Sequence, residues 1–250
     1  QAQMLKTGYP DSALHLLAKA PMGPVLYTGG LENYPQFLEQ VQELLPIAGI
    51  TGASLKKCRD VAGWSEFLDR KGLRVPKVLP SGVPPLKQLL WLAKPERSSG
   101  GKGIFKSQTA AGPGYFLQEF IKGQSKSAIF CFGMEGPRLL GTSLQIPPQE
   151  WLHSTQFQYS GNIGPLEPCL KEKEELEQIA HHLTEFCQPK GLLNLDYILA
   201  GDRVVPLEIN PRYSASMELM EYSTGQSLIR QHLEASGWHH LATHESPTLP

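Results

Sequence analysis

The most informative part of the sequence is GLLNLDYILAGDRVVPLEINPRY, residues 191–213. Two runs typical of β-strands, Leu192–Leu199 and Arg203–Ile209, meet at an Ala200-Gly201-Asp202 turn. Apolar and β-branched runs separated by a short glycine-containing turn predict a β-hairpin. We therefore expect residues 191–213 to form two paired antiparallel strands.

The predicted hairpin carries oxygen-bearing side chains that we expect to converge at one end. Asp196 lies on the first strand, and Glu208 and Asn210 end the second. Asp196 and Glu208 can face each other across the turn, and Glu208 and Asn210 share one face because they are two residues apart. Such oxygens, with Arg212 beside them, suit Mg²⁺ that also binds nucleotide phosphates. Taken alone, the pattern is equally compatible with an exposed acidic turn that ends at an Asn-Pro stop.

Length and composition limit the classes of protein. A chain of 250 residues with 40% hydrophobic content can form one large domain or two small ones. A net charge of −1 gives no reason to expect a nucleic-acid or membrane partner, and neither a long apolar run nor a signal peptide is visible. Four cysteines without metal-like spacing suggest reduced, mostly buried thiols in a cytoplasm. Because the chain begins with Gln1, it is interpreted as a fragment or a processed form.

The N-terminal part predicts half of an open α/β layer. Pro24–Thr28 is expected to be a short buried strand, Gly29-Gly30 a turn, and Pro35–Leu45 a helix. The glycine pair can receive a ligand at a strand end, although a tight turn explains it more simply. A second helix is expected to be capped by Ser54 and to end at Gly72.

A glycine-rich loop follows the apolar strand Leu89–Ala93, which ends at Lys94-Pro95. The chain then returns as the predicted strand Ile104–Ser107. Glycines let a backbone approach phosphate oxygens, and consecutive N–H groups form an anion nest. The loop is neither a P-loop nor GxGxxG, and a mobile surface hairpin is the simpler alternative. Its candidate ligand-binding residues are Ser98, Ser99, Gly100, Gly101, Lys102 and Gly103.

Three further predicted strands separate this loop from the acidic hairpin: Tyr115–Ile121, Ser127–Gly133 and Pro137–Ser143. The order is thus a glycine-rich flap, a hinge strand, more strands and an acidic hairpin. This order resembles the ATP-grasp superfamily from about Leu55 to His232. The resemblance rests on KPERSSGGKGI at 94–104, FLQEFIKG at 116–123 and LDYILAGDRVVPLEINPR at 195–212. It implies an α+β fold in which two lobes clamp ATP.

The resemblance also implies residue roles. Lys94 would contact the nucleotide phosphates under the flap Ser98–Gly103, and Arg212 would steady a phosphorylated intermediate. The hinge whose backbone reads adenine would comprise Gln118, Glu119, Phe120 and Ile121, ending at Lys122. The Mg²⁺ ligands would be Asp196, Glu208 and Asn210, and the same oxygens would accept Mn²⁺. The sequence departs from the family at Val61, where many members have a lysine, and at Ser125, where many have a ribose-binding glutamate.

A narrower likeness concerns a group of predicted ATP-grasp carboligases similar to tyramine–glutamate ligases. It rests on YTGGLENYP at 27–35, QEFIKGQSKSAIF at 118–130, FQYSGNIGP at 157–165 and LEINPRYSASMELME at 207–221. Members usually carry a fuller N-terminal lobe. The likeness implies L-glutamate as the acid and an aromatic amine such as tyramine as its partner, in cofactor biosynthesis.

The stretch Phe157–Pro165 is the candidate substrate loop. Its candidate contacts are Tyr159, Ser160, Gly161 and Asn162. Backbone N–H groups at 161–164 could hold a carboxylate, and Tyr159 could stack on an aromatic amine. A structural Ω-loop is the alternative. A helix is expected at Met217–Tyr222, with Ser214 or Ser216 as its N-cap, and Glu218 and Glu221 are expected to be helix-face charges rather than amine ligands.

The tail carries His239, His240 and His244, which complete no HExxH motif and favour a frayed polar terminus over a metal site. The expected organisation is therefore a partial α/β segment at 1–53, an N-lobe with the flap at 54–122, a C-lobe with the metal site at 123–238 and a tail at 239–250.

The expected activity is that of a ligase that joins small-molecule carboxylate and amine substrates through an acylphosphate. A homo-oligomer is compatible with the sequence, and the expected location is cytoplasmic. Two alternatives stay open at this point: an ATP-binding or regulatory module with reduced catalysis, and a phosphotransferase that stops at a phosphorylated product.

Overall fold

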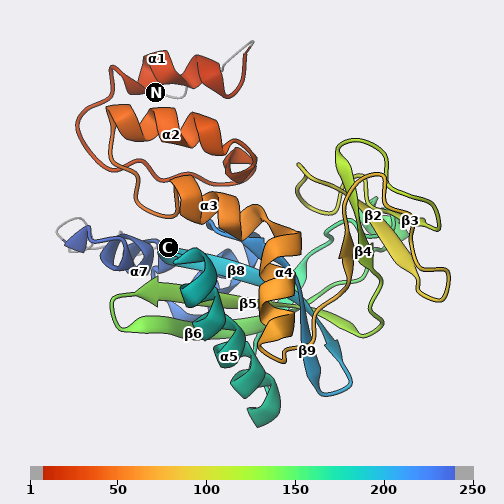
Figure 1. The fold of residues 1–250 in the computed structure, drawn as a ribbon. Coiled ribbons are helices and arrows are strands. Elements are labelled where there is room, and N and C mark those ends of the chain that lie inside the picture. Colours follow the sequence, from red (N-terminus) through yellow and green to blue (C-terminus); the bar gives the residue numbers. More distant parts are fainter. Residues whose placement is uncertain (1–7, 240–250) are drawn as a thin grey trace.

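The computed structural model describes residues 8–239 and combines helices with two separate antiparallel sheets (Figure 1). The predicted α+β class is confirmed. The larger sheet has the strand order β7-β6-β5-β8-β9. Its strands are β5 (Gln124–Gly133), β6 (Gly136–Gln145), β7 (Asn162–Leu166), β8 (Gly191–Ala200) and β9 (Arg203–Asn210). The predicted hairpin is confirmed as β8 and β9, at one edge of this sheet.

The two faces of the larger sheet have different coverings because side chains alternate along each strand. Helix α5 (Leu170–Cys187) packs its buried Leu176 and Leu183 against Phe130 and Leu195 on one face. Helices α6 (Ala215–Thr224) and α7 (Leu228–Ala235) cover Ile129 and its neighbours on the opposite face. The polar side chains of the predicted metal site lie on that second face, beyond the cover of α6 and α7.

The smaller sheet has the order β1-β4-β2-β3 and lies to the right in Figure 1. Its strands are β1 (Val78–Leu79), β2 (Trp91–Pro95), β3 (Phe105–Ser107) and β4 (Tyr115–Glu119). Trp91, Ala93 and Leu117 form its small buried core. The strands predicted around the glycine-rich loop are confirmed with shifted ends, and the loop joins β2 to β3.

The predicted single helix from Ser54 to Gly72 is wrong. The chain forms two helices, α3 (Gly52–Arg59) and α4 (Val61–Arg70). Asp60 breaks the helix with φ −81° and ψ 81°, and its carboxylate accepts a 2.9 Å hydrogen bond from the Gly63 N–H. An aspartate in this role is a favourable N-cap. The break makes Arg59 the last residue of α3.

The N-terminal segment contains α1 (Leu14–Leu17), α2 (Pro35–Leu44) and short 3-10 turns that include Leu31–Asn33. The helix predicted at 35–45 is confirmed, whereas the strand predicted at 24–28 is wrong. Its ends make isolated parallel bridges to different segments, Val25 to Ile47 and Thr28 to Tyr213, so no continuous ladder forms. The second bridge joins this segment to the chain just after the acidic hairpin.

The remaining sequence expectations concern the cysteines, membrane-spanning helices and the C-terminal tail. Cys58, Cys131 and Cys187 are buried, as predicted for most of the thiols, and Cys169 is exposed. Across residues 8–239, no helix has the length and apolar character needed to cross a bilayer. The tail histidines His240 and His244 lie outside the described residues.

Candidate active site

The acidic hairpin brings its three predicted ligands together. Asp196 and Glu208 are directly opposite each other in the β8–β9 register. The register shifts beside this pair, because Tyr197 pairs with Pro206 and leaves Leu207 as the extra residue of a bulge. Asn210 donates a hydrogen bond from Nδ2 to Asp196 Oδ2 at 2.9 Å. The predicted convergence of the three side chains is therefore what the structure shows.

Oδ1 of Asp196 is held by donors from three strands of the sheet, in addition to the bond from Asn210 to Oδ2. Its Oδ1 accepts hydrogen bonds from Ser127 Oγ at 2.7 Å, Asn194 Nδ2 at 2.9 Å and Gln145 Nε2 at 3.0 Å. Burial raises the pKa of Asp196, and the charge of Glu208 raises it further, against the lowering effect of the hydrogen bonds from Ser127 and Asn194. Two adjacent carboxylates therefore favour a cation between them.

The surroundings of Glu208 lower its pKa, whereas those of Asp196 raise the pKa of that residue. Burial by itself would raise its pKa, but the charges of Lys94, Arg59 and Arg212 outweigh burial and hold the pKa below its ordinary value. Arg59 Nη1 lies 3.0 Å from Glu208 Oε1. The sequence did not indicate Arg59, which reaches Glu208 from a position 149 residues earlier in the chain.

The donor set fits a hard divalent cation that shares its shell with phosphate oxygens. Within residues 8–239 no three His, Cys, Asp or Glu side chains group together as a metal site. Asp196, Glu208 and the amide of Asn210 offer two carboxylates and one neutral oxygen. Mg²⁺ is bound in this way, with one or two carboxylates, water and substrate phosphates. Mn²⁺ prefers the same oxygen ligands.

Arg212 lies beside the metal-site candidates and is fixed by several acceptors. Its Nε donates to Glu32 Oε1 at 2.6 Å, and Nη2 lies 3.4 Å from Asn210 Oδ1. Glu32 is only 1% exposed and also accepts a 2.8 Å bond from the Gly30 N–H. Glu32 was missed at the sequence level, where the neighbouring glycine pair was its only signal.

The positive charge of Lys94, on β2, acts to lower the pKa of both the Asp196 and the Glu208 carboxylate. Its Nζ donates to Gln118 Oε1 at 3.2 Å, and Gln118 Nε2 donates to the bulged Leu207 carbonyl at 3.0 Å. Gln118 is 1% exposed. This buried amide therefore joins the two sheets and orients Lys94.

Two backbone N–H groups of the predicted adenine hinge already donate hydrogen bonds within the protein. The Glu119 N–H donates to the Lys77 carbonyl and the Phe120 N–H to the Leu90 carbonyl, both at 2.8 Å. Ile121, which follows them, is buried. A base that contacts residues 118–121 would therefore use other backbone groups of this segment.

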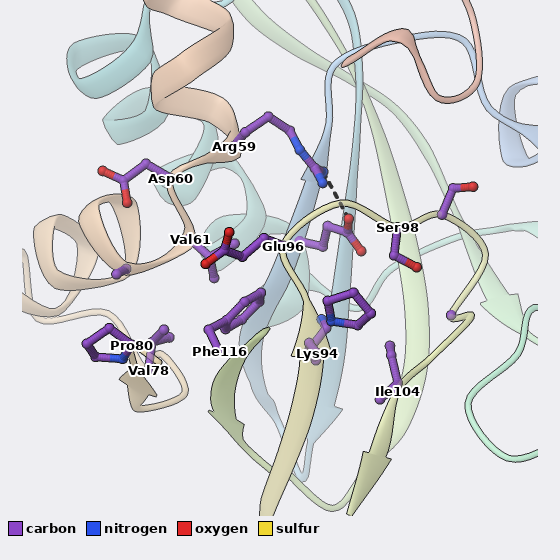
Figure 2. A pocket seen from close by; sticks show the side chains of 15 residues that line it. Arg59, Asp60, Val61, Val78, Pro80, Lys94, Glu96, Ser98, Ile104 and Phe116 are labelled. Carbon is purple, nitrogen blue, oxygen red and sulfur yellow. Dashed lines mark hydrogen bonds and ion pairs between the residues drawn. The ribbon is translucent and has the colours of Figure 1, made fainter. Parts of the chain in front are cut away.

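A cavity of about 350 Å³ lies between α3–α4, the smaller sheet and β9 (Figure 2). Its apolar lining includes Val61, Val78, Pro80, Ile104 and Phe116. Its charged lining comprises Arg59, Asp60, Lys94, Glu96 and Glu208. Of the predicted nucleotide residues, Lys94, Ser98, Ser99 and Gly101 line it, whereas Gly100, Lys102, Gly103 and the hinge residues 118–121 do not. An apolar wall next to convergent charges suits a flat aromatic base with an anionic tail.

The glycine-rich loop contacts the candidate substrate loop. The Tyr159 N–H donates to the Gly100 carbonyl at 3.1 Å. Gly101 has φ +74°, and a Cβ placed there would lie 1.8 Å from the Phe157 carbonyl oxygen. Only glycine fits this approach without a shift of the backbone. The loop from 98 to 103 is therefore closed against residues 157–159 in this structure.

The candidate substrate residues are only partly brought to the site. Tyr159 is half-exposed, and burial and then the charges of Asp196 and Glu218 raise the pKa of its hydroxyl. Ser160 instead bonds to Ser154 within the loop, and Asn162 Nδ2 donates to Ser216 Oγ at 2.6 Å.

The predicted loop 157–165 is wrong after Gly161, because Asn162–Leu166 pairs with β6 as an edge strand. Ser214 is the N-cap residue of α6, as predicted, but its side chain makes no capping hydrogen bond. Glu221 accepts hydrogen bonds from the Tyr213 hydroxyl and the Leu228 N–H, which is a structural role.

Ser125 stands where many ATP-grasp proteins have a ribose-binding glutamate. Its hydroxyl donates a hydrogen bond to Gln145, the residue that supports Asp196.

Comparisons with known proteins agree with this architecture. A family model described as an ATP-grasp domain matches residues 58–216. A solved ATP-grasp superfamily protein from Archaeoglobus fulgidus matches with a TM-score of 0.70 and 20% identity, covering 91% of this chain and 68% of that one. N5-carboxyaminoimidazole ribonucleotide synthetase from Thermus thermophilus matches with a TM-score of 0.70, 20% identity and coverage of 91% and 64%.

Biotin carboxylase from Campylobacter jejuni gives a TM-score of 0.67 at 14% identity, with coverage of 95% of this chain and 57% of that one. The chain thus spans less than two thirds of the synthetase and of the carboxylase. A comparison with curated proteins found no match. The similarities confirm the predicted ATP-grasp fold.

Proposed function

Because the chain belongs to the ATP-grasp family, we propose that it is an ATP-dependent ligase that joins a carboxylate to an amine through an acylphosphate. One observation carries this proposal: Glu208, which lies opposite Asp196 in the hairpin, lines a cavity that Lys94 and the glycine-rich loop also line. Carboxylates for a metal and cations for phosphates occur together at sites of phosphoryl transfer.

Each residue has a proposed role in holding ATP. Lys94, oriented by Gln118, neutralises the phosphates, and Ser98–Gly103 covers them with backbone N–H groups. The apolar wall that includes Val78 and Phe116 accepts the base. Asp196, Glu208 and Asn210 would hold Mg²⁺, which when bound would neutralise charge on the transferring phosphoryl group.

The reaction has two steps. A carboxylate oxygen of the acid bonds to the γ-phosphorus, the bond to the β,γ-bridging oxygen breaks, and ADP leaves. The amine then bonds to the carbonyl carbon, inorganic phosphate leaves with one former carboxylate oxygen, and the amine nitrogen loses a proton. Arg212, fixed by Glu32, would stabilise the negative charge of the acylphosphate. The protein itself needs no nucleophile for either step.

The first substrate pair to test is L-glutamate with an aromatic amine such as tyramine, in a cytoplasmic cofactor pathway. The sequence likeness to tyramine–glutamate ligases supports this choice. The half-exposed Tyr159 supports it too, because its N–H bonds to the Gly100 carbonyl of the glycine-rich loop, and an aromatic side chain beside this loop can stack on an aromatic amine.

A hydroxylamine trap tests the proposal. The protein is incubated with Mg-ATP, a panel of carboxylic acids that includes L-glutamate, and hydroxylamine as the amine. We expect one acid to give a hydroxamate and an equal amount of ADP. Glu208→Ala should abolish both products, whereas Glu177→Ala, which removes an exposed glutamate of α5, should leave them unchanged.

The trap also separates the remaining alternatives. A stable phosphorylated acid that never yields hydroxamate would identify a phosphotransferase. ATP binding without product from any acid would identify a binding module. Either result would contradict the proposed ligase activity.

A further inference from the structure

Arg59 holds a metal-ligand candidate although it belongs to neither sheet. Its guanidinium extends from the end of α3 to the Glu208 carboxylate, and Figure 2 marks this ion pair with a dashed line. The Nη1 atom lies 3.0 Å from Glu208 Oε1, and Nη2 donates to Asn33 Oδ1 at 3.0 Å. Arg59 is only 17% exposed, so the pair is partly shielded from water. Two partners on different segments thus fix the guanidinium at the cavity wall.

The position of Arg59 disfavours the binding of a divalent cation to Glu208 when no phosphate groups accompany the cation. A divalent ion that bound this carboxylate would lie close to the guanidinium, and two like charges at short range repel each other. A cation that arrives with phosphate groups avoids the conflict, because the phosphates carry negative charge toward Arg59. Arginine can exchange its carboxylate partner for a phosphate group, since its planar guanidinium binds carboxylate and phosphate with the same geometry.

The residues that line the cavity support this movement of Arg59 from carboxylate to phosphate. Arg59 and Lys94 line it together with Ser98 and Ser99 of the glycine-rich loop. The two cations therefore flank the space next to Glu208 in which the proposed function places the phosphates. The short helix break at Asp60 contributes to this geometry, because it ends α3 at Arg59.

We propose that Arg59 is a phosphate-binding residue that occupies Glu208 until a metal–nucleotide complex arrives, and thereby selects the complex over the free metal ion. This proposal rests on the proposed function. In the nucleotide-free protein Arg59 competes with a divalent cation for Glu208. In the nucleotide complex Glu208 binds the metal ion, and Arg59 moves to the phosphates.

Two binding measurements on the full chain test the proposal without turnover. The first titrates Mn²⁺ alone and follows its paramagnetic resonance signal. The second titrates ADP at saturating Mg²⁺ by calorimetry. For Arg59→Ala we expect Mn²⁺ to bind at least threefold more tightly than to the unaltered protein, and ADP to bind at least tenfold more weakly. A residue that only stabilised the fold would weaken both.

Three further variants make the comparison specific. Arg59→Lys keeps the charge but loses the fork, so Mn²⁺ affinity should stay near that of the unaltered protein while ADP binds a few-fold more weakly. Arg59→Gln keeps an amide for Asn33 without the charge and should behave like Arg59→Ala. If the alanine variant does not fold, Arg59→Gln replaces it in both binding measurements. Arg70→Ala removes an exposed arginine of α4 and should change neither affinity.

The possible outcomes separate this proposal from the proposed function. Unchanged ADP affinity in Arg59→Ala and Arg59→Gln would overturn the phosphate role. Weaker Mn²⁺ binding in both folded variants would overturn the competition and make Arg59 a support for Glu208. If the unaltered protein bound no ADP with Mg²⁺, the proposed function itself would fail, and the proposal with it.

Discussion

Glu32 and Arg212 form an ion pair of 2.6 Å between the N-terminal segment and the end of the acidic hairpin. The carboxylate is almost completely buried, and Arg212 is 13% exposed. A buried pair of this kind is costly to break, because the remaining charge loses its partner without gaining water. The pair sets the direction of the guanidinium proposed to stabilise the acylphosphate.

Replacing Glu32 should impair both stability and turnover. For Glu32→Ala we expect a loss of about 3 kcal/mol in the free energy of unfolding, as for other broken buried pairs. Hydroxamate formation should fall at least tenfold through kcat, with a smaller change in KM for ATP. Glu32→Asp should recover part of the rate, and Glu39→Ala, which removes an exposed pair with Lys56, should match the unaltered protein. Full activity in a folded Glu32→Ala variant would contradict the role.

Apart from the residues that the family resemblance indicated, such as Lys94, the site could be predicted only where its residues are close along the chain. Asp196, Glu208 and Asn210 belong to one hairpin, so strand alternation and a short turn sufficed to place them together. Glu32 lies 180 residues from Arg212, and Arg59 lies 149 residues from Glu208. Tertiary packing creates these pairs, and no local pattern encodes them.

At the scale of elements, the glycine-rich loop and the loop 157–159 act on each other through backbone atoms. The Gly100 carbonyl accepts the Tyr159 N–H, and Gly101 approaches the Phe157 carbonyl too closely for any Cβ. In the proposed function this contact closes the phosphate cover over the second substrate. The flap and the substrate loop would then open and close together.

Gly101→Ala should prevent this closure. Its Cβ would meet the Phe157 carbonyl at 1.8 Å, and the residue would also carry a left-handed φ of +74°. We expect KM for ATP to rise about tenfold, since a displaced cover forfeits one or two hydrogen bonds of about 1 kcal/mol each. Steady-state kinetics of hydroxamate formation measure this change.

Gly100→Ala is the matched control for the flap. It has a similar φ of +63°, but nothing lies within 4 Å of its Cβ position. It should therefore change KM much less. Equal effects of the two substitutions would show that loop strain, rather than contact with residue 157, limits nucleotide binding.

The elements themselves were predicted unevenly. The strands on both sides of the flap and the acidic hairpin follow from clear apolar runs and turns. The predicted helix 54–72 failed because Asp60 resembles a mid-helix residue until its side chain caps α4. The predicted strand at 24–28 failed because its ends pair with separate segments, which only the complete fold brings near.

At the scale of the whole molecule, His232 joins three parts of the chain. Its Nδ1 accepts a hydrogen bond from the Leu192 N–H at 2.9 Å, and its Nε2 lies 2.9 Å from the Ala48 carbonyl. The neutral ring with hydrogen on Nε2 satisfies both contacts. This histidine on α7 therefore links β8 to the N-terminal segment, and burial lowers its pKa.

Stability should consequently depend on pH through His232. Because its pKa is lower in the folded protein than in the unfolded chain, the unfolded state takes up the proton first as the pH falls. The stabilisation is complete above the unfolded pKa of about 6.5 and is lost as the pH falls toward the folded value. Urea unfolding at several pH values should show this decline.

Two histidine variants identify the source of the pH dependence. His232→Gln cannot titrate and should flatten the decline below neutral pH, at a cost in stability at pH 8. His181→Gln removes an exposed histidine and should keep the decline. An unchanged pH profile in His232→Gln would assign the effect to other groups.

The transfer of one oxygen from the acid to phosphate is the most direct test of the proposed chemistry. The acid identified by hydroxylamine trapping is labelled with ¹⁸O in its carboxylate and converted to amide with Mg-ATP and the amine. Mass spectrometry of the released phosphate should find one ¹⁸O for each amide formed, because the acylphosphate leaves with a former carboxylate oxygen. Phosphate without ¹⁸O, or ¹⁸O in AMP, would show that the acid is not activated by phosphorylation and would contradict the account.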